Sequence, residues 1–348
     1  MNKFLAPHSP YRIFAVSLLI TLAAVIWSGV SLGLAAMFLV MVLIVIEITF
    51  SFDNAIINAR VLHTMSPFWQ RMFMTIGILI AVFGMRLVFP ILVVMVTAGL
   101  SWSDVINLAL NQPEQYSQEL ERAHGSISAF GGMFLLMLGL HYFFDKTRDV
   151  TWIGAIEKPL IRVGHWWMSG LVSLVVLGII LILPLHDTTS AIAIAGLSGI
   201  ATYSIIHGLS ELFTRRYNVE AGQAVAKTGL AGLTAFIYLE ILDASFSFDG
   251  VIGAFAITKD VVLIAVGLGV GALWVRSLTL FMVRRKVLHA YRYLEHGAHY
   301  TITLLATVLL AGLIFDFPEA IAGVAGLIII GLSINSSIKA KRVVSSHG

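Results

Sequence analysis

The sequence has 348 residues, of which 58% are apolar and only 12% are charged. Soluble domains average about 45–50% apolar and roughly 25% charged residues, so ordinary soluble folds, disordered chains and collagens are excluded. A net charge of +3 gives no indication of nucleic-acid binding, and the absence of cysteine excludes disulfides and thiolate metal sites. The remaining class is an all-α protein that crosses a lipid bilayer several times.

The apolar segments predict ten membrane spans, because about 20 mostly apolar residues cross the hydrocarbon core. In chain order the expected spans are 12–29, 33–59, 72–97, 126–145, 169–185, 190–212, 228–257, 260–283, 300–316 and 319–338. Lys3 and Arg12 before the first span resemble the start of a signal peptide, but no small-residue cleavage site follows, so we expect this span to be retained.

Lysine and arginine predict the orientation, because they collect on the inner side of a membrane. With both termini inside, the outer loops hold only Arg122 and Lys259. We therefore expect a multi-pass protein of the bacterial inner membrane with cytoplasmic termini. Residues 148–168 predict a helix lying on the inner surface, since they combine basic and aromatic side chains. These are Trp152, Lys158, Arg162, His165, Trp166 and Trp167.

A short motif occurs twice, in the second and seventh expected spans. Residues 47–54 read Glu-Ile-Thr-Phe-Ser-Phe-Asp-Asn, and residues 243–250 read Asp-Ala-Ser-Phe-Ser-Phe-Asp-Gly. The span after each copy contains an arginine, Arg86 and then Arg276. Five crossings separate the copies, so they run in opposite directions. This predicts an inverted repeat with halves at about 12–145 and 190–316 and an added last span, as in many secondary transporters, whose sites lie at the repeat interface.

The expected spans hold more acids than bases. Each charge costs about 2.5–3.5 kcal/mol near the centre of a span. The two arginines neutralise two acids, so up to three negative charges remain for a proton or a metal ion. The alternative is structural ion pairing, which accounts well for the arginines but not for every acid. The acids are Glu47, Asp53, Glu240, Asp243 and Asp249.

We expect Asp53 and Asp249 to be the primary ligands of a cation. Glu47, Glu240 and Asp243 are expected to be ligands or proton carriers. On a continuous helix, six residues turn about 240°, so Glu47 and Asp53 would face apart. A break near each Ser-Phe-Ser-Phe-Asp stretch would let the acids converge, as in discontinuous transporter helices.

The ligand types indicate a hard ion. Carboxylate, amide and carbonyl oxygens suit Mg²⁺, Ca²⁺ or Mn²⁺, whereas zinc favours histidine. Oxygen atoms near the acids that support such a site belong to Asn54, Asn58, Ser51 and Ser247. Two histidines, His141 and His207, are each followed four residues later by an acid. They are either polar anchors or members of a metal site or proton relay.

The repeat resembles the TerC/Alx membrane family, which is grouped with LysE-type exporters. The positions that carry the resemblance are Glu47, Ser51, Asp53, Asn54, Pro67, Arg71, Gly77, Arg86, Asp243, Ser247, Asp249, Gly250 and Arg276. Residues 130–142 and 293–300 resemble its YkoY-like branch, long described only as a domain of unknown function. Several members are implicated in manganese export and others in tellurite resistance, so the resemblance implies efflux of a divalent metal. Gly250 departs from the amide or hydroxyl residue often found there.

The sequence thus predicts an exporter of a divalent cation, most of all Mn²⁺, driven by proton antiport. No tightly bound cofactor and no enzymatic activity are expected, and homo-oligomerisation stays open. Three alternatives remain. The first is an exporter of an amino acid or another organic cation, and the second is an intramembrane aspartyl-type hydrolase, although its GxGD context is missing here. The third is a non-transporting scaffold for stress proteins.

Overall fold

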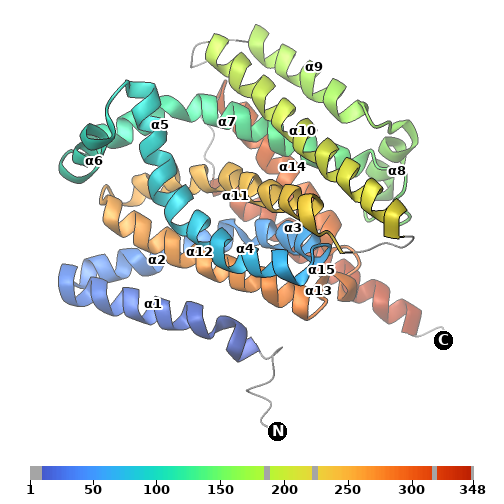
Figure 1. Ribbon diagram of the computed structural model, residues 1–348, viewed down its shortest axis with the longest axis horizontal. Helices are drawn as coiled ribbons and strands as arrows, with labels where there is room; N and C mark the ends of the chain where they lie inside the picture. The colour runs from blue at the N-terminus through green and yellow to red at the C-terminus, as the bar shows by residue number, and fades with distance from the viewer. Residues whose placement is uncertain (1–9, 184–188, 222–225, 316–319, 346–348) are drawn as a thin grey trace. The chain divides into compact units, whose positions relative to one another are not determined.

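The computed structural model describes the chain except residues 1–9, 184–188, 222–225, 316–319 and 346–348 (Figure 1). The described residues are almost entirely helical, and one bridge between Met65 and Lys227 is their only β pairing. The all-α class is confirmed. The helices are α1 (Pro10–Leu32), α2 (Leu34–Phe50), α3 (Phe52–His63), α4 (Pro67–Leu79), the π-helix η1 (Ile80–Val88), α5 (Phe89–Ala98), α6 (Trp102–Asn111), α7 (Pro113–Phe143), α8 (Gly154–Val163), α9 (Met168–Ile182), α10 (Thr189–Ala221), α11 (Gly229–Ile257), α12 (Val261–Arg284), α13 (Val287–Ala290), α14 (Leu294–Gly312) and α15 (Ala320–Ser345).

Seven helices of the described chain are long and apolar enough to cross a membrane. Two bent pairs, α2 with α3 and α8 with α9, raise the number to nine if each pair is one span. The difference from the ten expected spans is α14, which falls outside this set because its first two turns carry Glu295, His296 and His299. The chain is therefore a multi-pass membrane protein.

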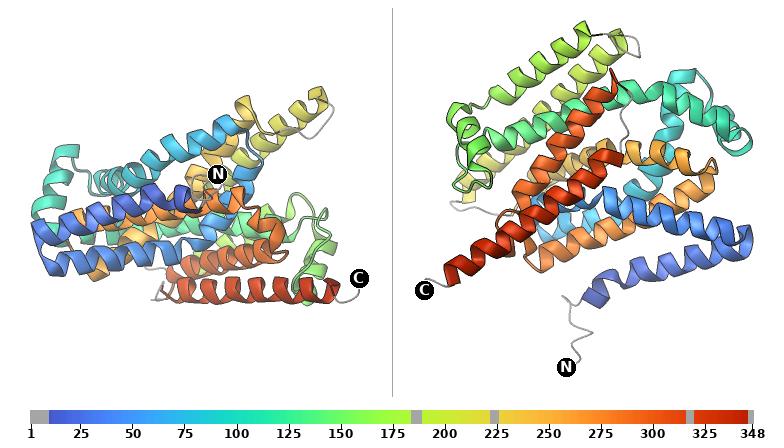
Figure 2. Two further views of the ribbon diagram at one scale, coloured as in Figure 1. Left: turned by 90° about the horizontal axis from the view of Figure 1, so that it is seen from below. Right: turned by 180° about the vertical axis from the view of Figure 1, so that it is seen from behind.

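The chain forms two compact units. Unit 1 comprises 1–124 and 226–285, and unit 2 comprises 125–225 and 286–348. In unit 1, α12 packs against α1, α2, α3 and η1, and the further views show α1 and α2 running beside it (Figure 2). In unit 2, α14 packs along α15, and α9 along α10. Both copies of the repeated motif lie in unit 1, because α11 and α12 pack with the N-terminal helices.

The two motif copies differ in backbone. The first is broken at Ser51, where α2 ends and α3 begins at an angle of 53°. The second lies inside α11, which is continuous from 229 to 257. The hypothesis of a break is confirmed for the first copy and wrong for the second. In α11 the hydroxyl of Ser245 donates to the carbonyl oxygen of Ile241, one turn earlier in the same helix. This is the hydrogen bond that a serine forms inside a helix.

Close approach between α2 and α12 depends on two glycines. A Cβ on Gly267 would lie 2.5 Å from Leu43 Cβ, and a Cβ on Gly271 would lie 2.5 Å from Glu47 Cβ. The four-residue spacing places both glycines on one face of α12, as in the small-residue packing of membrane helices. Glu47 therefore reaches the interior of unit 1.

Candidate functional site

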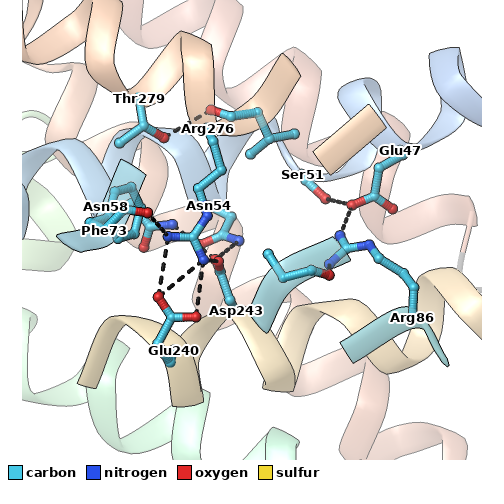
Figure 3. A network of polar contacts seen from close by, with 12 residues as sticks. Glu47, Ser51, Asn54, Asn58, Phe73, Arg86, Glu240, Asp243, Arg276 and Thr279 are labelled. Atoms are coloured by element: carbon cyan, nitrogen blue, oxygen red, sulfur yellow. Dashed lines mark hydrogen bonds and ion pairs between the residues drawn. The ribbon is translucent and has the colours of Figure 1, made fainter. Parts of the chain in front are cut away.

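The first acid of the first motif forms a buried ion pair. Glu47 on α2 pairs with the guanidinium of Arg86 on η1, and both side chains are buried. The hydroxyl of Ser51 donates to the same carboxylate oxygen, Glu47 Oε1, at 3.1 Å. Arg86 also donates from Nη1 to the carbonyl oxygen of Ala81 at 2.6 Å. This group is drawn on the right of Figure 3.

The π-helix that carries Arg86 has a local sequence cause. Pro90 has no N–H to donate to the carbonyl of Arg86, and its ring crowds that carbonyl in a regular α-helix. The wider turn of η1, over 80–88, ends shortly before this proline. Single π-turns recur at functional sites, because they redirect a side chain without ending the helix. Here the redirected side chain is a buried arginine.

The first acid of the second motif also meets an arginine. Arg276 on α12 pairs with Asp243 and, through Nη2, with Glu240 Oε2 at 3.1 Å, both on α11. Its Cζ lies 3.8 Å from the centre of the Phe73 ring. A Cβ on Gly77 would lie 2.7 Å from Glu240 Oε1, so only glycine leaves room for this group. Figure 3 shows Arg276 between the two carboxylates.

Two amides of α3 hold Asp243 from the other side. Asn54 Nδ2 and Asn58 Nδ2 donate to Asp243 Oδ1 at 2.6 and 2.9 Å. Their Oδ1 atoms are buried and accept no hydrogen bond from the described residues, and the same holds for the hydroxyl of Ser247. A buried oxygen without a donor is costly, so these atoms are available to a cation or a water.

Asp53 differs from the other described acids of the two motifs, because it pairs with no described arginine. Its side chain is 4% exposed, and it forms no ion pair with a described residue. It lies in the first turn of α3 and accepts a hydrogen bond from the N–H of Asn54 at 2.8 Å. The free N–H groups of a helix start favour a negative charge. The break at Ser51 thus creates the helix terminus beside which Asp53 is buried.

The predicted ligands are only partly brought together. Glu240, Asp243, Asn54 and Asn58 form one group with Arg276, whereas Glu47 and Ser51 form a second with Arg86. The side chain of Asp249 lies outside the described residues. Within the described part of the chain, no cluster of three or more His, Asp or Glu side chains is arranged to hold a metal ion. The arginines pair with acids, as the structural alternative expects.

The two predicted relay histidines lie together in unit 2. The rings of His141 on α7 and His207 on α10 have centres 4.1 Å apart, and Tyr203 stacks on His207 at 5.5 Å. Their acidic neighbours do not complete a metal cluster with them in the described structure.

Sequence reasoning missed two kinds of residue. Phe73 supports Arg276, but one phenylalanine among 21 carries no sequence signal. Glu157 is fully buried in unit 2 and pairs with Arg148. The signal for it is weak, since an acid in the basic segment 148–168 is also expected at a solvated surface.

A family model described as a protein of unknown function, DUF475, matches residues 52–344. No curated protein and no solved structure matches the chain. The family match covers most of both units and the second motif, and it begins one residue after the break at Ser51. The resemblance to the TerC/Alx family is not tested by this match and stays a prediction.

Proposed function

Because the chain belongs to the DUF475 family, a family of unknown function, its activity has to be argued from the site, and we propose a secondary transporter that exports a divalent cation, Mn²⁺ foremost, in exchange for protons. One observation carries this proposal. Asp53 is buried in a membrane protein and forms no ion pair with an arginine of the described residues, because Arg86 and Arg276 pair with other acids.

The charge balance of the described site supports a mobile cation. Four buried acids share two arginines, so two negative charges stay uncompensated when all are ionised. These acids are Glu47, Asp53, Glu240 and Asp243. An uncompensated charge in the bilayer costs several kcal/mol, so it attracts a proton or a metal ion.

The buried oxygen atoms of the two motifs and of α3 support a hard divalent ion. Asn54, Asn58 and Ser247 each offer a buried oxygen without a described donor. Together with the carboxylate of Asp53, these are the ligand types that Mn²⁺, Mg²⁺ and Ca²⁺ accept. By the sequence repeat, Asp249 is the expected second carboxylate. A soft ion or zinc would favour sulfur or histidine, which the described residues of this group do not supply.

Proton exchange follows from the same charge balance. A carboxylate that releases its metal in the bilayer takes up a proton, since a bare charge there is costly. Glu47 and Glu240 are the proposed proton carriers, and Arg86 and Arg276 hold the acids in place. The proposed setting is a bacterial inner membrane with both termini in the cytoplasm, where export removes the ion from the cell.

The test is Mn²⁺ uptake into everted membrane vesicles. We expect Asp53→Asn and Asp249→Asn to abolish uptake while the protein still folds, because each removes a ligand charge. Asp149→Asn is the matched control, since Asp149 is exposed on a loop of unit 2. Undiminished Mn²⁺ uptake by both site variants would refute the assignment of these ligands. If added lysine, and not added Mg²⁺, competes with Mn²⁺ uptake, the result would favour an exporter of organic cations.

A further inference from the structure

A second feature lies in unit 2, where α8 meets α9 at a bend of 105°. The inner face of α8 is fixed by Glu157, which is fully buried and pairs with Arg148. Its Oε1 accepts hydrogen bonds from the N–H groups of Trp152 and Ile153 at 3.1 and 3.0 Å. The orientation of α8 is therefore set by buried hydrogen bonds.

The turn after α8 is equally constrained. A Cβ on Gly164 would overlap the carbonyl oxygen of Phe144, so the backbone there packs directly on the end of the preceding segment. The hydroxyl of Tyr300 on α14 donates to Glu157 Oε1 at 3.3 Å and ties α8 to the rest of unit 2. The α8–α9 elbow, residues 154–168, thus presents one fixed outer face.

That outer face has two parallel stripes. Lys158 and Arg162 are exposed and four residues apart, so they share one side of α8. Ile156 and Val163 are 48% and 49% exposed and, seven residues apart, form an adjacent apolar stripe. Trp166, at the corner, is 87% exposed. The only acid of α8 is the buried Glu157, so the exposed charged side chains of α8 are all basic.

We propose that the α8–α9 elbow is a binding site for anionic phospholipids. Lys158 and Arg162 bind the headgroup phosphate, whose negative charge is not neutralised by a headgroup cation in an anionic lipid. Ile156, Val163 and Trp166 lie at the start of the acyl chains. A basic stripe beside an apolar one is the arrangement of helices that lie in the interface. This site is independent of the transported ion, so it goes beyond the proposed function.

The experiment is a titration of the detergent-solubilised full chain with short-chain phosphatidylglycerol or phosphatidylcholine, read by the thermal unfolding midpoint. We expect phosphatidylglycerol to raise the midpoint of the unmodified chain more than phosphatidylcholine does. Each basic residue near an anionic lipid surface contributes about a fivefold change in binding. Lys158→Gln should therefore weaken phosphatidylglycerol binding about fivefold, and Lys158→Gln with Arg162→Gln should remove the preference.

The matched control is the double variant Lys339→Gln with Lys341→Gln, which makes the same change in charge on exposed residues of α15 in the same unit. It should keep the preference for phosphatidylglycerol. An unchanged midpoint in phosphatidylcholine shows that each variant folds. The proposal is overturned if the unmodified chain has no preference, if the elbow variant retains it, or if both double variants lose it equally.

Discussion

Arg276 shows how strongly single residues of the site depend on one another. Its guanidinium contacts two carboxylates and the face of Phe73, and all of these side chains are buried or close-packed. Breaking a buried ion pair by removing one partner leaves an uncompensated charge, whereas removing both partners together is often neutral. The role of Arg276 as a counter-ion is therefore tested by comparing its single substitution with one that also removes its two acidic partners.

Arg276→Met is expected to lower the free energy of unfolding by about 3–5 kcal/mol, because Glu240 and Asp243 lose their buried counter-ion. Adding Glu240→Gln and Asp243→Asn to the same chain should restore most of the loss. Denaturant unfolding in detergent measures both. Equal stability of the single and triple variants would contradict the role of Arg276 as a counter-ion.

At the scale of elements, the two motif copies differ because the first contains the break between α2 and α3 and the second has none. Their local sequences are nearly the same, yet only Ser51 ends a helix. The packing of α2 and α3 against α12 accompanies this difference. The sequence therefore predicted a break near the motif but not that it would occur in one copy alone.

Gly271→Ala tests the close approach of α12 to α2. The added methyl group would lie within 2.5 Å of Glu47 Cβ and 3.2 Å of the Ile44 carbonyl oxygen, so one helix has to shift. Overpacking of this kind costs about 1–3 kcal/mol. We expect a lower thermal midpoint and weaker Mn²⁺ uptake.

Gly253→Ala on α11 is the control for this variant, because nothing lies within 4 Å of its added methyl group. Alanine in place of a helical glycine is expected to stabilise by about 0.5–1 kcal/mol. Similar losses in both variants would contradict a specific contact at Gly271.

At the scale of the whole molecule, composition and the apolar segments predicted the all-α membrane class and the long apolar helices, but not the short helices α6 and α13. The pairing of Arg86 and Arg276 with acids was also predicted from the sequence. An arginine inside a membrane span needs a negative partner, and the acids of the expected spans are the available ones. The split into two units could not be predicted, since it joins residues 226–285 to the N-terminal helices through packing alone. The buried Glu157 of unit 2 was missed for the same reason.

The stability of unit 2 should depend on pH through His296. Its imidazole is buried, and burial lowers its pKa from the ordinary value of 6.5. The carboxylates of Glu157, which lies 3.5 Å away, and of Glu295 favour the protonated ring, and Arg148 disfavours it, but burial is the largest effect. The neutral ring donates from Nε2 to the carbonyl oxygen of Val150 at 2.9 Å.

Because the neutral form is favoured in the folded chain, its contribution is fully present above about pH 6.5 and is lost as the pH falls below that value. Thermal midpoints measured between pH 8 and pH 5 should therefore decrease on acidification, and His296→Gln should reduce this decrease. His165→Gln, at an exposed position, should leave it unchanged.

For the proposed transporter, the guanidinium held between Glu240 and Asp243 has a consequence for ion selectivity. A cation that is covalently attached to the protein never diffuses away, so every visiting ion that approaches these carboxylates meets a permanent competitor at a very high local concentration. A singly charged visitor gains no electrostatic advantage over it, whereas a doubly charged one gains about twice the attraction. For the proposed transporter, this competition predicts discrimination against sodium and potassium.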